Sequence, residues 1–239
     1  MKIFEGMTYN IRGFWLGVKT PKLLMLGLIR LAAVIIITII FASLILVYHQ
    51  EILTLIWTRP ESRWLLWLWY LLSWMLSLFL VALSSVFSYL ISQILFCVII
   101  MDAMSQITER LVSGQEKEPQ KMPFLKRFFY LIKQEIPRTI VPVLLSLLIM
   151  LLGWLTPLGP LFTIFSSLTA VIFLAWDNTD LVPARRLYPF RSRFKFFYKN
   201  LPVHLGFGLL FLIPIAGIFF LSFSPVGATL YYIKEHDNI

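Results

Sequence analysis

Residues 213–232, IPIAGIFFLSFSPVGATLYY, are almost wholly apolar, yet they contain Pro214, Gly217, Pro225 and Gly227. Proline removes a backbone N–H donor and its ring clashes with the preceding turn, so a stretch built as one membrane-crossing helix usually lacks it. The run is therefore apolar enough for lipid and too interrupted for one straight helix.

The composition of the whole chain places it in a membrane. Of its 239 residues, 59% are hydrophobic and 14% are charged, compared with about 45–50% and 25% in soluble domains. Uncharged runs at 31–48 and 64–101 exceed the roughly 18 apolar residues that indicate a transmembrane helix. The first run is also longer than the apolar region of a cleaved signal peptide. We therefore expect an all-α integral membrane protein that keeps this first anchor.

The basic residues form blocks that predict the topology. Five Lys and Arg lie within residues 2–30, seven within 110–138 and six within 185–199. Only Arg59 and Arg63 lie between the two long apolar runs. Under the positive-inside rule the blocks are cytoplasmic and the loop at 49–63 is outside. The net charge of +9 thus mostly reflects topology: it predicts a multi-pass protein with both termini cytoplasmic, and no nucleic-acid partner.

Two long transmembrane helices are expected first, over 26–48 and 63–112. In the second, the apolar run stops near residue 101 and helical periodicity continues, with Met104, Ile107 and Leu111 on one face. About fifty helical residues measure roughly 75 Å, more than twice the hydrocarbon thickness. The second helix is therefore expected to extend into the cytoplasm.

Two amphipathic segments are expected at the membrane surface. In the segment 123–135, apolar and aromatic residues such as Phe124 and Phe128 face away from basic residues such as Lys126 and Lys133. A basic amphipathic helix over 183–200 repeats this character. Such helices lie in the membrane interface. The alternative for 123–135 is a soluble amphipathic helix that packs on the protein's own cytoplasmic part.

The prolines and glycines predict two helical hairpins, over 139–176 and 202–233. Between Pro142 and Pro157 there is room for about 14 helical residues, or roughly 21 Å, which is short for about 30 Å of hydrocarbon. The uncharged turns have basic segments on both flanks. We therefore expect both hairpins to enter the membrane partway and return, with a break at Pro225. Ordinary full-crossing pairs are the alternative. The predicted turn residues are Pro157, Gly159, Pro160, Pro214, Gly217, Pro225 and Gly227.

No motif for covalent chemistry is present. The sequence has no phosphate-binding G-x-x-x-x-G-K-[ST] loop and no H-E-x-x-H or Cys/His cluster. We expect no catalytic residue, no metal and no cofactor. Broken membrane helices can instead hold anions at their N-termini. The candidate residues for an anion path are Lys19, Lys22, Arg30, Arg185 and Arg186. The alternative for each is a topological anchor, which is the usual role of basic residues at cytoplasmic helix ends.

Two other classes of function stay open at this point. A non-transporting membrane scaffold could use its basic interfacial helices to bind anionic lipid or a protein partner. An intramembrane enzyme would need an acid–base cluster, for which Asp177, Asp180 and His204 are the candidates.

The last third of the chain resembles the CysZ-type sulfate permeases of bacterial inner membranes. The resemblance rests on AWDNTDLVP at 175–183, IP at 213–214 and GAT at 227–229. Weaker similarity covers RGFW at 12–15 and ERLVSG at 109–114. The resemblance implies two full membrane helices, two partly inserted hairpins, homo-oligomeric assembly and passive or proton-linked sulfate uptake for sulfur assimilation.

The resembled family differs from this chain at its sulfate contacts. The permeases carry an arginine pair shortly after the proline that begins the first helix, whereas Leu23, Leu24 and Met25 occupy that neighbourhood here. An asparagine in the permeases' last turn is replaced by Gly217, and a proline is shifted to Pro225. The resemblance therefore predicts the scaffold more firmly than the site.

Overall fold

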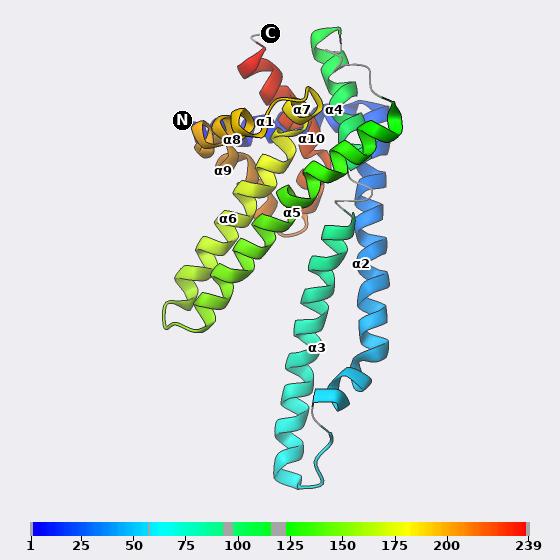
Figure 1. Ribbon diagram of the computed structural model, residues 1–239, viewed down its shortest axis with the longest axis vertical. Helices are drawn as coiled ribbons and strands as arrows, with labels where there is room; N and C mark the ends of the chain where they lie inside the picture. Colours follow the sequence, from blue (N-terminus) through cyan, green and yellow to red (C-terminus); the bar gives the residue numbers. More distant parts are fainter. Residues whose placement is uncertain (1, 57, 93–97, 116–122, 238–239) are drawn as a thin grey trace. The chain divides into compact units, whose positions relative to one another are not determined.

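The computed structural model describes residues 2–56, 58–92, 98–115 and 123–237, and within these ranges the secondary structure is helical, without a strand (Figure 1). In chain order, the helices are α1 (Lys2–Lys19), α2 (Pro21–Ile56), α3 (Arg63–Ser92), α4 (Val98–Ser113), α5 (Phe124–Trp154), α6 (Gly159–Thr179), α7 (Leu181–Arg185), α8 (Phe190–Lys199), α9 (Leu201–Leu209), the short 3-10 helix η2 (Leu210–Leu212) and α10 (Ala216–His236).

Four stretches within these helices are long and apolar enough to cross a membrane, namely Pro21–His49, Trp64–Val81, Gly159–Thr179 and Ala216–His236. Shorter apolar helices cover Ile140–Gly153 and Leu201–Leu212. The chain is an all-α integral membrane protein, as its composition predicts. The stretch in α10 differs from the first two because most of it is buried inside the protein itself.

The chain forms two compact units, Ala32–Gln93 and the remainder. In the smaller unit, α2 and α3 are joined by hydrogen bonds, with Ser77 Oγ 2.7 Å from His49 Nε2 and Ser88 Oγ donating to Ile37 O at 3.5 Å. The first helix is longer than the predicted 26–48. The predicted single helix over 63–112 corresponds to α3 and α4, but residues 93–97 lie outside the described residues, so its continuity stays a prediction.

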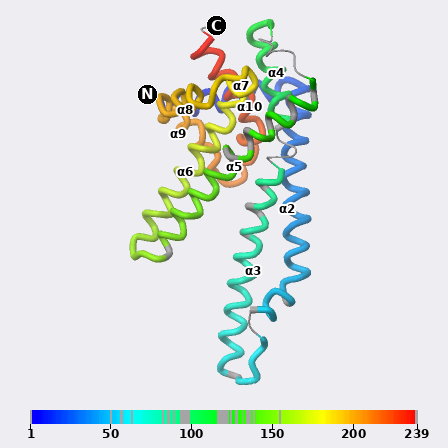
Figure 2. The backbone as a smooth tube through the Cα atoms, viewed as in Figure 1, coloured from blue at the N-terminus to red at the C-terminus, as the bar shows by residue number. Residues whose placement is uncertain are grey.

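The larger unit contains two helical hairpins (Figure 2). In the first, α5 and α6 lie side by side and are joined by a turn at 155–158. The sequence predicts a separate helix over 123–135, whereas α5 is a single helix that continues through Pro137 and Pro142. Each proline removes only one backbone donor, and a helix still satisfies the other backbone groups locally. Pro157 lies in the turn, and Gly159 and Pro160 begin α6.

The second hairpin joins α9 and η2 to α10. At its turn, the Ala216 N–H donates to Pro214 O at 2.6 Å, and Ile215 between them has φ +63°. This three-residue γ-turn is strained for a β-branched residue. Gly217 lies in the first turn of α10, but Pro225 and Gly227 lie in its interior. The predicted break at Pro225 is therefore absent, and Gly227 is not a turn residue.

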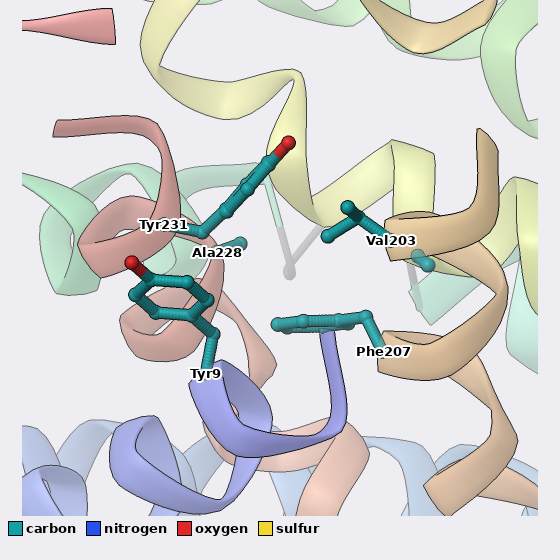
Figure 3. Packing of buried hydrophobic residues seen from close by; sticks show 6 residues of the cluster. Tyr9, Val203, Phe207, Ala228 and Tyr231 are labelled. Atoms are coloured by element: carbon teal, nitrogen blue, oxygen red, sulfur yellow. The ribbon is translucent and has the colours of Figure 1, made fainter. Parts of the chain in front are cut away.

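The polar N-terminal segment, for which the sequence analysis assigns no helix, forms α1 and packs against α9 and α10. A Cβ atom on Gly13 would lie 2.2 Å from the Cα of Gly227, so both positions must be glycine for the helices to cross this closely. Beside the crossing, the rings of Tyr9 and Tyr231 meet edge to face near Phe207 (Figure 3). This apolar cluster fixes α10 on α1.

The basic amphipathic helix predicted over 183–200 is two helices, α7 and α8, separated by a sharp turn. Leu187 adopts φ +60°, and the Tyr188 N–H donates to Pro183 O at 3.0 Å. This is the backbone pattern of a left-handed helix cap, a place that glycine usually occupies. The turn redirects the chain so that α7 and α8 contact different parts of the larger unit.

Candidate anion site

The segment WDNTD, at 176–180, ends α6 with four consecutive buried polar residues, Asp177 to Asp180, each at most 4% exposed. Buried polar groups require partners. The Asn178 amide donates to Leu174 O and its Oδ1 accepts from Ser224 Oγ at 2.5 Å. Thr179 Oγ1 lies 2.8 Å from His204 Nε2. Asn178 and Thr179 thus connect α6 to α10 and α9.

Arg138 and Arg193 neutralise the two aspartates of this segment. Arg138, on α5, lies 2.7 Å from Asp177 and 3.0 Å from Asp180, and Arg193, on α8, lies 2.6 Å from Asp180. Burial raises the pKa of Asp180, and the two guanidinium groups oppose that shift. The cluster holds the end of α6 against α5 and α8.

A second buried cluster surrounds Glu109 on α4. Its carboxylate accepts hydrogen bonds from both Arg185 and Arg186, and Arg186 also lies 2.7 Å from Asp237. Burial lowers the pKa of Arg186, but the hydrogen bonds to Asp237 and Glu109 raise it by more, so the net shift is upward. Arg185 also contacts Ser105 at 3.2 Å and Asp102 at 3.7 Å. Both arginines are therefore already paired with carboxylates.

Arg30, near the start of α2, has a different environment. Its side chain is 3% exposed, and its Nη1 donates to Leu221 O at 2.7 Å and to Ser224 Oγ at 3.4 Å. Leu221 O is the carbonyl that residue 225 would normally bond in an α-helix, but Pro225 has no N–H to donate. The guanidinium of Arg30 thus replaces the donor that the proline removes.

Arg30 is a buried cation with neutral partners. Within the described part of the chain, no carboxylate forms an ion pair with it, in contrast to Arg138, Arg185, Arg186 and Arg193. Burying an unpaired charge is costly. Leu221 and Ser224 both accept from a single nitrogen of Arg30, Nη1. The guanidinium has further N–H donors, so an anion could supply both the balancing negative charge and additional acceptors.

The five predicted path residues are not one cluster. Lys19 and Lys22 are exposed at the junction of α1 and α2, Arg185 and Arg186 share Glu109, and Arg30 contacts α10. Neither Asn178 nor Ser224 is among the site residues predicted from the sequence. The sequence does contain a signal for a polar contact here. Pro225 inside an apolar helix leaves the carbonyl of Leu221 without its usual backbone donor, so a side-chain donor is required.

The acid–base cluster considered for an enzyme does not form. His204 contacts Thr179 and the carbonyl of Asn200, at 2.8 Å each, and both aspartates contact arginine. Among the residues that the structure describes, no group of three or more His, Cys, Asp or Glu could hold a metal ion.

Fold and site together define a class of protein: a polytopic helical membrane protein with two hairpins and buried arginines that contact both of them. A comparison with known families agrees with this class. Residues 9–222 match the family described as Sulfate transporter CysZ/Etoposide-induced protein 2.4, and the chain belongs to this family. Among curated proteins, no significant match is found.

Proposed function

We propose that the protein is a permease or channel for a small inorganic anion, with sulfate as the leading candidate, supplying sulfur assimilation. The observation that carries the proposal is Arg30, a buried guanidinium without a carboxylate partner among the described residues. Arginine suits tetrahedral oxyanions because its planar fork donates two parallel hydrogen bonds. Membership of a family described by sulfate transport supports the choice of ion.

The other predicted path residues have supporting roles in this proposal. Arg185 and Arg186 are occupied by Glu109, so they hold α4 and α7 together. Lys19 and Lys22 are exposed and can raise the local anion concentration near the start of α2. No covalent chemistry and no cofactor are invoked.

The proposal places the protein in a bacterial inner membrane with both termini cytoplasmic, because the basic blocks would then lie inside. The hairpins enter partway, since their shorter apolar arms, Ile140–Gly153 and Leu201–Leu212, measure only about 21 and 18 Å. Non-helical backbone at membrane depth needs protein cover. Pro157 and Pro214 are exposed in the turns, which favours a homo-oligomer in which a second copy covers them.

Uptake of labelled sulfate into proteoliposomes, measured at several pH values, tests the proposal. We expect flux above that of empty vesicles, and Arg30→Gln is expected to reduce it at least about tenfold, because hydrogen bonds to a charged group contribute roughly 1.5–3 kcal/mol. Arg30→Lys keeps the charge without the fork and is expected to be intermediate.

The matched control is Arg12→Gln, which removes the same charge from an exposed position on α1. Its flux is expected to equal that of the unmodified protein. Correctly folded protein that carries no sulfate would end the transport proposal. Equal flux from the Arg30→Gln and Arg12→Gln variants would show that Arg30 is not part of the anion path.

A further inference from the structure

A cavity of about 580 Å³ lies between α5, α6, α8 and the turn that precedes α8. Its volume is within the range of ligand-binding pockets, about 300–1,000 Å³. Most of its described lining is aromatic or aliphatic, including Val141 on α5, Phe173 and Trp176 on α6, and Phe190 and Phe194 on α8. Its cationic side chains are Lys133, Arg138 and Arg193, and Asp180 supplies one negative charge.

The cavity is distinct from the candidate anion site. None of its lining residues contacts Arg30, whose partners are Leu221 and Ser224. The transport proposal and the use of this cavity are therefore independent.

We infer that this cavity binds one anionic phospholipid, with the phosphodiester near Lys133 and an acyl chain along the aromatic wall. Arg138 and Arg193 are paired with Asp177 and Asp180, whereas Lys133 is exposed and forms no hydrogen bond or ion pair with a described residue. The lining thus carries an excess of positive charge, which an anionic headgroup complements.

Two buried donors in the wall also point to a ligand with acceptor oxygens. Trp176 Nε1 and Arg193 Nε are buried and have no hydrogen-bond partner in the described structure. Both residues line the cavity. Phosphate or ester oxygens of a lipid would satisfy these donors after a small adjustment of the side chains.

The place of the cavity in the fold favours a lipid over a free ion. Trp176 is the last apolar residue of α6 before Asp177, so the cavity lies where the apolar hairpin meets polar surroundings. Phe190 is 60% and Phe194 45% exposed, which leaves the apolar wall open to the surface. Helices with exposed aromatic and basic residues lie at the headgroup level. A small inorganic ion would leave the apolar wall uncovered.

Native mass spectrometry of the full chain, with phosphatidylglycerol or phosphatidylcholine added to the detergent, tests this inference. We expect one phosphatidylglycerol to be retained in preference to phosphatidylcholine. Lys133→Gln is expected to weaken phosphatidylglycerol retention about fivefold, the effect of one lysine near anionic lipid. Lys126→Gln removes the same charge from an exposed position on the same helix outside the cavity lining and is expected to change nothing.

A second pair of variants tests the apolar wall. Phe194→Ala is expected to weaken retention of both lipids, whereas Tyr198→Ala, an exposed α8 position outside the cavity lining, is expected to leave it unchanged. Phosphatidylglycerol should also raise the unfolding temperature of the unmodified protein more than that of the Lys133→Gln variant, because a ligand stabilises the state that binds it.

Three results would overturn the inference. Equal losses in the Lys133→Gln and Lys126→Gln variants would indicate general attraction between charges and no site. Displacement of the lipid by inorganic sulfate at millimolar concentration would indicate a small-ion site. Retention of an acidic peptide in place of lipid would assign the cavity to a protein partner.

Discussion

At the scale of single residues, Glu5 on α1 carries a pH dependence that can be measured. Burial, the charge of Glu235 and a hydrogen bond with Glu235 raise its pKa from 4.5, and Lys2 and Lys234 oppose the shift. The folded protein therefore binds more protons than the unfolded chain between pH 4.5 and the raised pKa. Glu5 therefore makes the stability of the folded protein fall as the pH rises through this window. Outside the window, Glu5 adds no pH dependence.

Glu5→Gln is therefore expected to raise the unfolding temperature above the window, with the gain disappearing as the pH falls toward 4.5. Thermal unfolding of the purified protein in one detergent at several pH values measures the difference. Glu61→Gln, at an exposed glutamate of the smaller unit, serves as the control. A gain from Glu5→Gln that does not change with pH would contradict the assignment.

The arginines show what can be read from the sequence at this scale. Arg30, Arg185 and Arg186 look alike in the sequence, as cations near helix ends. Their difference depends on partners far away in the chain: Glu109 is 76 residues from Arg185, and Leu221 is 191 residues from Arg30. The residue types of the candidate site could be predicted, but the pairing that distinguishes an arginine bound to a carboxylate from one with neutral partners could not.

At the scale of elements, Pro225 and Arg30 are coupled through one carbonyl. In the present protein, Leu221 O accepts a hydrogen bond from Arg30 at 2.7 Å, and Ser224 Oγ lies 2.6 Å from the same oxygen. Pro225→Ala restores a backbone N–H that competes for this acceptor. Arg30→Gln should therefore be better tolerated in the Pro225→Ala background, with a coupling energy of about 1 kcal/mol or more.

A double-mutant cycle of unfolding free energies, measured in one detergent, gives this coupling directly. The same cycle with Arg12→Gln in place of Arg30→Gln is expected to show none, because Arg12 is exposed on α1. If the effect of Arg30→Gln is the same in both backgrounds, Arg30 does not replace the missing donor.

The elements also show where sequence patterns mislead. The hairpin turns at 155–158 and 213–215 fall where proline and glycine predict them. Pro137, Pro142 and Pro225 do not interrupt their helices. A proline ends a helix only where the loss of its N–H donor cannot be tolerated and no other donor replaces it. For Pro225, the replacement donor comes from another helix. Helix α1 is not predicted because three of its five buried residues are glycines, which have low helix propensity and here allow close helix crossing.

At the scale of the whole molecule, the depth of the hairpins remains a prediction with a direct test. Leu158 is 56% exposed and Ile215 is 77% exposed, so the chain itself does not shield either turn from a reagent. Lipid or a second copy would have to do so. A turn that stops within the membrane is therefore inaccessible from outside, whereas a full-crossing hairpin presents its turn to the outer aqueous phase.

Single-cysteine variants distinguish these two arrangements. With the sole cysteine, Cys97, replaced by serine, Leu158→Cys and Ile215→Cys are expected to resist a membrane-impermeant maleimide added outside intact cells. Glu61→Cys, in the loop between α2 and α3, is expected to react, and all three should react after denaturation. Reaction of Leu158→Cys or Ile215→Cys at the rate of Glu61→Cys would establish full-crossing hairpins. The partly inserted arrangement would then be wrong, and the anion would need a different path between Arg30 and the cytoplasm.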